Sequence, residues 1–194
     1  ETVIDNAALE PEIDDLILML NSMGAKIQRD PTDQKRINIQ GVSSLKGTEH
    51  SIICDRNEIV TFACAALATK GAINILRVKP DVVKTFLDTI KNMGADVKVG
   101  NDEICIEWVK PLSNINIETG PEPMFMTDWQ AIFTILLTQT VGCSSIIERV
   151  YPNSFQHIEN LKKMGVKVNF FNPNISDPEN YYQFNPESDD PKYF

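Results

Sequence analysis

The chain has 194 residues, 42% of them hydrophobic and 23% charged, a balance typical of a globular protein with one or two cores. Its formal net charge of −9 argues against nucleic acid as a partner, because phosphate groups attract a basic surface. No apolar run approaches the roughly 20 residues of a membrane-spanning helix, so we expect no membrane partner.

The spacing of apolar residues predicts helices and strands along the whole chain. In chain order these are a helix after Pro11, strands from Ala25 and Ile37, a helix over 55–71, a strand from Ala72, a helix with Asp81 at its N-cap, strands from Ala95, Ile104 and Ile115, a helix over 127–142, a strand from Ser145, a helix carrying Phe155, Ile158, Leu161 and Met164, and a strand from Val166. The segment after Phe170 is rich in proline and acidic residues, and we expect it to be loop.

Three stretches of the chain follow the same pattern around a Met-Gly step: MLNSMGAKI from Met19, TIKNMGADV from Thr89 and NLKKMGVKV from Asn160. Their Met-Gly steps are 70 and 71 residues apart, and a fixed period of this kind indicates a repeated structural unit. Each glycine is expected to end a helix in the left-handed conformation, with a strand to follow. These glycines are Gly24, Gly94 and Gly165.

A second type of helix lies between the copies, over 55–71 and 127–142. Both begin with a predicted capping box, Asp55 with Glu58 and Thr127 with Gln130. The second is apolar almost all round over 131–137, so we expect it to be buried beneath sheets from neighbouring copies. The predicted fold class is therefore α/β (α+β), with repeats of about 70 residues packed around shared buried helices.

The four cysteines form no CxxC pair and have no paired histidine spacing, so no metal site is expected. They are predicted to be reduced structural thiols: Cys54, Cys64, Cys105 and Cys143. Cys54 is expected to be the most exposed, because it lies next to a helix start.

Several motifs, together with the repeat, resemble the UDP-N-acetylglucosamine 1-carboxyvinyltransferase family. They are DNAALEPEI (5–13), CDRNE (54–58), PEPMFMTDWQA (121–131) and RVYPNSFQHIENLKKMG (149–165), and the resemblance covers about residues 1–170. It implies a cytoplasmic transferase that moves the enolpyruvyl group of phosphoenolpyruvate to the 3′-hydroxyl of UDP-N-acetylglucosamine. This reaction is the first committed step of peptidoglycan synthesis, and through the cell wall it bears on cell shape and division. No cofactor is implied.

The resemblance also implies an inside-out arrangement, with helices buried and sheets outside, in two domains of three repeats each. Residues 1–30 would end the first domain, 35–170 would form about two repeats of the second, and 171–194 would be an irregular acidic segment. The family's loop with a catalytic cysteine, and the basic residues that hold phosphoenolpyruvate, are not matched here. The chain begins with Glu1 rather than methionine, so we expect it to be part of a longer protein and inactive alone.

Asp128 is the candidate catalytic residue. The preceding repeat has Arg56 at the equivalent position, so the fold itself does not require a carboxylate there. An acidic residue in a first turn can also serve only to favour the positive end of the helix. The resemblance implies a second role, as the general base that accepts the proton of the sugar 3′-hydroxyl. It further implies a substrate contact at Val150, through its backbone. Thr127 and Arg56 are additional candidates for substrate binding, Arg56 because its position could face the cleft between the domains.

Two departures from the family leave other hypotheses open. Ser154 stands where the family usually has an arginine, which removes a fixed positive charge. The acidic C-terminal segment also departs from the family pattern. A non-catalytic relative that binds a sugar nucleotide or a protein is therefore an alternative. The shikimate-pathway enolpyruvyl transferase is another, because that family shares the repeats. His157 lies beside an apolar stripe and is expected to be structural.

Overall fold

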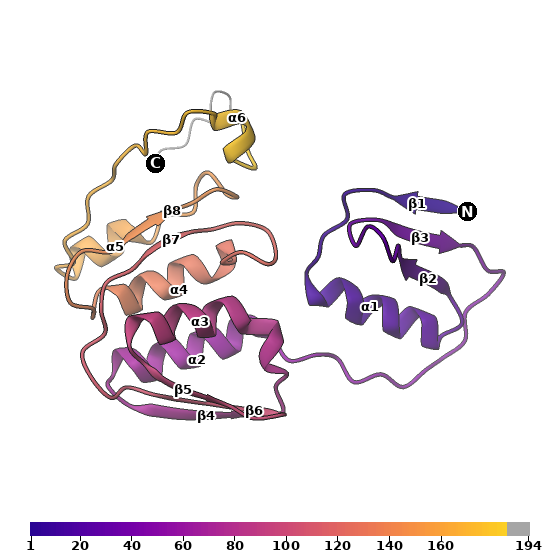
Figure 1. Ribbon diagram of the computed structural model, residues 1–194, viewed down its shortest axis with the longest axis horizontal. Coiled ribbons are helices and arrows are strands. Elements are labelled where there is room, and N and C mark those ends of the chain that lie inside the picture. The colour runs from indigo at the N-terminus through magenta and orange to yellow at the C-terminus, as the bar shows by residue number, and fades with distance from the viewer. Residues whose placement is uncertain (186–194) are drawn as a thin grey trace. The chain divides into compact units, whose positions relative to one another are not determined.

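Residues 1–54 form the first of two units in the computed structural model, which describes residues 1–185 (Figure 1). This unit contains β1 (Thr2–Ile4), α1 (Pro11–Ser22), β2 (Lys26–Arg29) and β3 (Ile37–Gln40). The strands form an antiparallel sheet in the order β1-β3-β2, in which Ile39 pairs with Thr2 on one side and with Ile27 on the other. α1 begins at Pro11, as predicted, while β1 is a strand that the sequence pattern did not predict.

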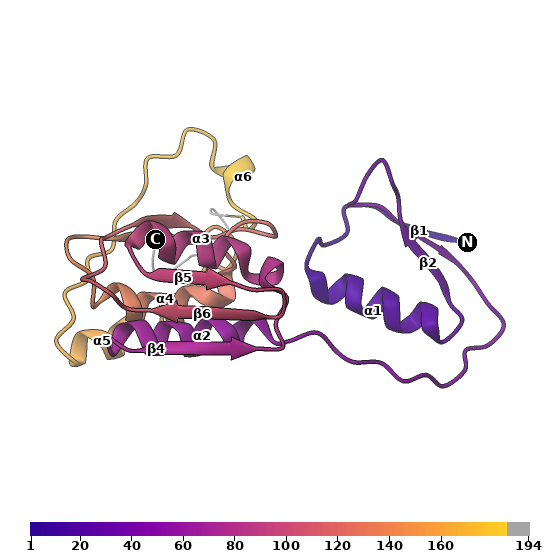
Figure 2. The ribbon, with the colours of Figure 1, turned by 60° about the horizontal axis from the view of Figure 1, so that its bottom comes forward.

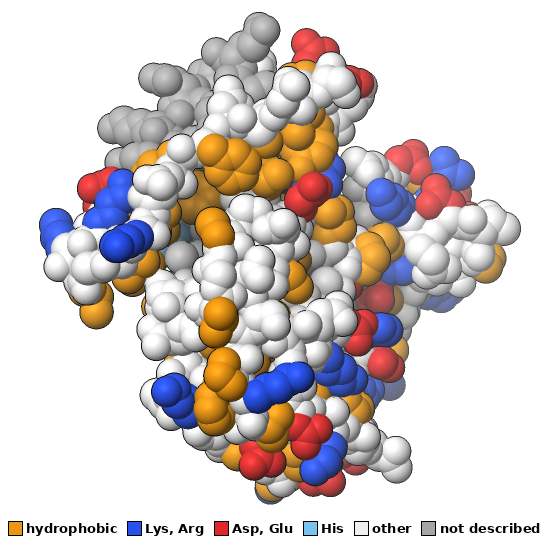
Figure 3. Space-filling model, turned by 60° about the vertical axis from the view of Figure 1, so that its left-hand side comes forward, with side chains coloured by type: hydrophobic (Ala, Val, Ile, Leu, Met, Phe, Trp, Pro, Cys, Tyr) orange, Lys and Arg blue, Asp and Glu red, His pale blue; other side chains and the backbone are white. Residues whose placement is uncertain are grey.

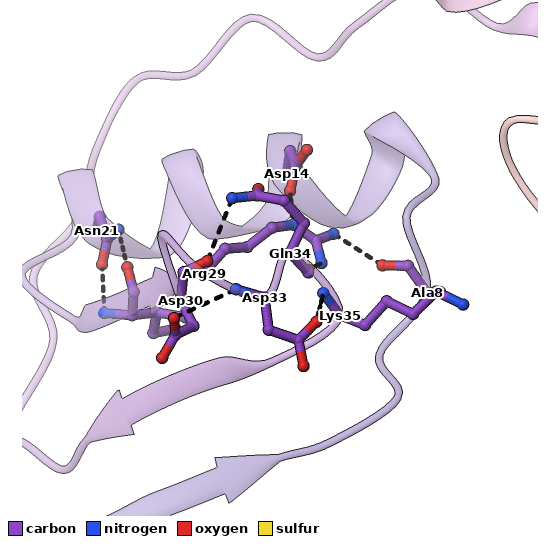
Figure 4. A network of polar contacts seen from close by, with 9 residues as sticks. Ala8, Asp14, Asn21, Arg29, Asp30, Asp33, Gln34 and Lys35 are labelled. Carbon is purple, nitrogen blue, oxygen red and sulfur yellow. Dashed lines mark hydrogen bonds and ion pairs between the residues drawn. The ribbon is translucent and has the colours of Figure 1, made fainter.

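Polar contacts connect the parts of the first unit (Figure 4). The Arg29 side chain of β2 is 10% exposed and forms an ion pair with Asp14 of α1. Its terminal nitrogens donate to the backbone carbonyl oxygens of Gln34 and Ala8, both at 2.8 Å. Within residues 1–54, Ile37 is the only buried hydrophobic side chain, and α1 has no buried residue. The unit is therefore a thin layer of one helix on one small sheet.

The second unit begins at Asp55 and repeats this topology. Its elements are α2 (Arg56–Ala68), β4 (Ala72–Leu76), the short 3-10 helix η1 (Pro80–Val83), α3 (Lys84–Met93), β5 (Asp96–Val99), β6 (Glu103–Glu107), β7 (Asn116–Glu118), α4 (Thr127–Leu137), β8 (Ser145–Ile147), α5 (Ile158–Lys163) and α6 (Pro178–Tyr181). The antiparallel order β4-β6-β5 is that of β1-β3-β2 one repeat earlier. β7 and β8 form a separate, parallel pair.

Helices α2, α3 and α4 lie between the sheet β4-β6-β5 and the pair β7-β8 (Figures 1 and 2). α2 packs against α4 and against the sheet strands β4 and β6. Aromatic side chains fill the space between the helices, with ring centroids 4.9 Å apart for Phe125 and Phe133 and 6.1 Å apart for Phe86 and Trp129. This arrangement, with helices inside and sheets outside, is the inside-out α/β fold that the sequence predicted.

The repeat glycines end their helices as predicted, with φ of 103° at Gly24, 105° at Gly94 and 93° at Gly165. Two details of the predicted repeats are wrong. Asp81 lies inside η1 and does not cap α3, whose N-cap residue is Val83. Residues 166–170 form no strand, because no neighbouring strand in the described part of the chain supplies hydrogen-bond partners for their backbone.

The predicted division of the chain between residues 30 and 35 falls inside a hairpin. β2 and β3 pair over four residues, from Lys26 with Gln40 to Arg29 with Ile37. The boundary between the two compact units lies between residues 54 and 55, and the predicted division of the chain into family domains stays a prediction. In the C-terminal segment, 171–185 contains only the one-turn helix α6, in keeping with an irregular segment, and 186–194 lie outside the described residues.

The buried helices are not covered on every side. Phe62 of α2 is 57% exposed and Ile135 of α4 is 51% exposed, whereas Phe133 and Leu136 of α4 are fully buried. Figure 3 shows hydrophobic side chains at the surface of one face of the molecule, among charged ones. The expectation of a helix buried all round is thus met on one face of α4 only. Within residues 1–185, no helix combines the length and the apolar character needed to cross a membrane.

Candidate functional site

The N-terminus of α4 presents the predicted catalytic residue. Asp128 lies in the first turn, and its side chain is exposed. The predicted capping box of Thr127 and Gln130 is wrong, because the N-cap position is occupied by Met126 and no side chain caps the helix. The Thr127 hydroxyl instead donates to Glu148 Oε2 at 2.9 Å, and Gln130 is buried. Thr127 is the first helical residue rather than the N-cap, so its hydroxyl oxygen does not take the position from which a cap accepts the N–H groups of the first turn.

Glu148 is the residue that organises this end of the second unit. Its side chain is 7% exposed, and its Oε1 atom accepts hydrogen bonds from the Thr119 hydroxyl at 2.7 Å and from the backbone N–H groups of Val150 and Tyr151 at 2.7 and 3.0 Å. With the Thr127 hydroxyl on Oε2, four donors surround one carboxylate. A buried charge is tolerated when it is hydrogen-bonded in this way.

The parallel pair β7-β8 brings these groups together. Glu118, the last residue of β7, pairs with Ile147, the last residue of β8, so the two strands end side by side. Beyond them, the Thr119 N–H donates to the Ile147 carbonyl oxygen at 2.9 Å, and the Arg149 N–H donates to the Thr119 hydroxyl oxygen at 2.9 Å. Thr119 and Glu148 therefore meet just past the sheet, at the point where the chain turns toward Val150.

The loop before α4 is held from two other helices. Arg56 of α2 donates to Glu122 Oε2 at 2.7 Å, and the Thr85 hydroxyl of α3 donates to the Pro123 carbonyl oxygen at 2.7 Å. Arg56 is 2% exposed, with its guanidinium carbon 5.9 Å from the centre of the Trp129 ring. This interior position gives Arg56 a structural role, and its contact with substrate stays a prediction.

Among the predicted site residues, Thr127 and Val150 bond to the Glu148 carboxylate, and Asp128 directly follows Thr127. Arg56 lies in the core beside Trp129, the next residue of α4. Sequence reasoning missed Glu148. Its signal was an acidic residue directly after two isoleucines in the predicted strand motif SIIERV. An acidic residue that is drawn into the interior at the end of a strand needs hydrogen-bond donors, and this requirement could have marked it as a candidate.

Ser154 and His157 lie close together on the approach to α5. The Ser154 hydroxyl oxygen is buried and has no hydrogen-bond partner among the described residues, while its carbonyl oxygen lies 3.2 Å from His157 Nδ1. Burial lowers the pKa of His157, so its neutral form is favoured. This environment suits the structural role predicted for His157.

The C-terminal segment folds back onto the end of β8. The Gln183 N–H donates to the Arg149 carbonyl oxygen at 2.7 Å, and the Arg149 guanidinium carbon lies 4.1 Å from the centre of the Tyr181 ring. Burial raises the pKa of Tyr181 to about 12, and Tyr182 is buried. Tyr181 therefore packs against Arg149, the residue between Glu148 and Val150.

The cysteines are free thiols, and Cys143, not Cys54 as predicted, is the exposed one. Cys54 is half-buried. Within residues 1–185, no cluster of three or more histidine, cysteine, aspartate or glutamate side chains could hold a metal ion.

The chain was compared with known protein families. The family model described as EPSP synthase (3-phosphoshikimate 1-carboxyvinyltransferase) matches residues 1–186. The chain belongs to the EPSP synthase family.

Relatives within the EPSP synthase family bear the name UDP-N-acetylglucosamine 1-carboxyvinyltransferase. The chain is 43% identical over 170 residues to the one from Pasteurella multocida, 42% over 168 residues to the one from Halothermothrix orenii, and 36% over 168 residues to the one from Pelagibacter ubique. Each match covers 87% of this chain but only 39–40% of the relative. The chain thus spans about two fifths of the length of these relatives.

A solved structure supports the fold. The crystal structure of the enolpyruvyl transferase NikO from Streptomyces tendae matches with a TM-score of 0.71 and 24% sequence identity, over 83% of this chain and 38% of that one. At this identity the likeness concerns the fold alone, and it agrees with the inside-out arrangement of α2, α3 and α4.

Proposed function

We propose that the protein containing this chain transfers the enolpyruvyl group of phosphoenolpyruvate to the 3′-hydroxyl of UDP-N-acetylglucosamine. The observation that carries the proposal is the exposed carboxylate of Asp128 at the N-terminus of α4, in a chain 36–43% identical to transferases of that name. Such an enzyme would act in the cytoplasm, at the first committed step of peptidoglycan synthesis, and so would affect cell shape and division.

The reaction requires a base near the sugar. A bond forms between the 3′-oxygen and C2 of phosphoenolpyruvate, the bond from C2 to the phosphate oxygen breaks, and the hydroxyl proton must leave. Asp128 can accept that proton, because a carboxylate within hydrogen-bond reach of a hydroxyl can act as a general base. The groups that hold phosphoenolpyruvate would come from the remainder of the longer protein.

Val150 and Thr127 would complete the acceptor site. The Val150 N–H is already bonded to Glu148, so a ligand contact with the Val150 backbone would use its carbonyl oxygen. The Thr127 hydroxyl donates to Glu148 and keeps lone pairs that can accept a hydrogen bond from the sugar.

Phosphate release by the complete protein tests the proposal. With phosphoenolpyruvate present, we expect release to depend on UDP-N-acetylglucosamine and to be absent with shikimate 3-phosphate. Calorimetric titration of UDP-N-acetylglucosamine provides an independent measure of binding. Binding without any phosphate release would instead support a non-catalytic relative, for which the uncharged Ser154 is the motivating observation.

A second acceptor is favoured by one finding. The family model that matches residues 1–186 is described by the 3-phosphoshikimate reaction, so shikimate 3-phosphate is the alternative substrate. Release of phosphate with shikimate 3-phosphate and not with the nucleotide sugar would identify shikimate 3-phosphate as the acceptor. The three relatives named above all bear the nucleotide-sugar name, and for this reason we place that acceptor first.

A further inference from the structure

We propose that Glu148 is a positioning residue that sets the distance between Asp128 and the backbone of Val150 in the acceptor site. This inference rests on the proposed function, because it assigns Glu148 a part in the same reaction. Glu148 itself is 7% exposed and would not touch the reacting atoms. It would act through the residues to which it is bonded.

The bonds of Glu148 reach three separate segments. Oε2 accepts from Thr127 at the start of α4, and Oε1 accepts from Thr119 after β7 and from Val150 and Tyr151 after β8, all at 2.7–3.0 Å. Hydrogen bonds to a buried carboxylate are shorter and stronger than those between neutral groups. Removal of this acceptor would leave four donors, one buried and three part-buried, without it, so the segments that it joins would separate or rearrange.

Two of these segments carry the candidate site. Thr127 directly precedes Asp128, and the bonded N–H of Val150 belongs to the residue whose carbonyl oxygen is available to a ligand. The Glu148 carboxylate therefore fixes Thr127, which precedes the proposed base, and Val150, which would contact the substrate. Orientation of this kind matters because a displacement of about 1 Å can lower a rate by about 10²-fold.

The preceding repeat shows that the fold itself does not require this bond. At the same offset of 72 residues, Asp55 stands in place of Thr127 and Leu76 in place of Glu148. Asp55 caps its own helix by accepting from the N–H groups of Asn57 and Glu58, and Leu76 is 63% exposed. Both members of the pair differ between the repeats, and they differ together. The link from strand end to helix start is thus specific to the repeat that carries Asp128.

Kinetics of three variants of the complete protein test the role. Glu148→Ala removes both acceptor atoms, and we expect kcat/KM for UDP-N-acetylglucosamine to fall about 10²-fold. Glu148→Gln keeps Oε1 for three donors, and its amide can donate to the Thr127 hydroxyl, so we expect it to restore most of the activity. Phe133→Leu is the control, because Phe133 is a fully buried residue of α4 outside the Glu148 contacts. It should lower stability while kcat/KM stays at the wild-type value.

Hydrogen exchange measured by mass spectrometry supplies a readout besides activity. In Glu148→Ala, the amides of Val150 and Tyr151 should lose protection, and in Phe133→Leu they should keep it. If Glu148→Ala is folded and its kcat/KM equals that of wild type, the positioning role is refuted while the proposed function stands. If wild type itself releases no phosphate with UDP-N-acetylglucosamine, the proposed function fails, and the positioning role fails with it.

Discussion

Arg56 and Glu122 form an ion pair in the interior of the second unit, with 2.7 Å between Arg56 Nη1 and Glu122 Oε2. Arg56 is the counterpart of Asp128 one repeat earlier, yet it is 2% exposed and Asp128 is exposed. Equivalent positions at two helix starts thus have opposite environments. Arg56 holds the loop that leads into α4, whereas Asp128 is accessible to a ligand.

Replacement of Arg56 separates these two roles. Arg56→Met in the complete protein leaves Glu122 without its cation, and we expect a loss of about 3 kcal/mol of stability, since one partner of a largely buried pair is removed. The double variant Arg56→Met with Glu122→Gln should recover part of that loss. Thermal denaturation measures the stability, and titration of UDP-N-acetylglucosamine measures binding. A double variant that is stable but no longer binds UDP-N-acetylglucosamine would show that Arg56 contributes to substrate binding.

Acid should weaken the packing around His157. Burial lowers its pKa in the folded protein below the ordinary value of about 6.5, so the unfolded chain binds this proton more readily. The contribution of His157 to stability is therefore fully present above pH 6.5 and is lost as the pH falls toward the lower folded-state pKa. We expect Tm to fall less steeply between pH 7.5 and pH 5 in His157→Gln than in wild type. Equal slopes would contradict this assignment.

The cysteines should differ in their reaction with a maleimide at pH 8. Burial raises the pKa of the Cys64 thiol to about 12, so only about one molecule in 10⁴ carries the reactive thiolate, and the side chain is 4% exposed. Cys143 is exposed and should be labelled first. Mass spectrometry of peptides identifies the labelled residue, with Cys143→Ser as control. Early labelling of Cys64 in the native protein would mean that α2 opens readily.

The helices and the repeat could be predicted because their signals are local. The Met-Gly step at Gly24, Gly94 and Gly165 combines an apolar helix stripe with a residue suited to positive φ, and both act over a few residues. β1 was missed, because three residues are too few to show an alternating pattern. The strand expected from Val166 had the right composition, but a strand also needs a neighbour, which composition does not reveal.

The candidate site was predictable in part for the same reason. Asp128 could be selected from the motif around it, whereas the hydrogen bonds of Glu148 that hold the start of α4 could not be predicted. The capping rule expected the Thr127 hydroxyl to bond within its own helix, but a carboxylate 21 residues further along the chain is the partner. Long-range contacts of this kind depend on β7 and β8 ending side by side, which follows from their register and not from either segment alone.

Asp128→Asn in the complete protein tests the central claim most directly. The amide keeps the size of the carboxylate but cannot accept the hydroxyl proton, and loss of a general base lowers a rate by about 10²–10⁴-fold. We predict that calorimetric binding of UDP-N-acetylglucosamine is nearly unchanged, while kcat for phosphate release falls by at least about 10²-fold. A variant that releases phosphate at the wild-type rate would contradict the assignment of Asp128 as the base.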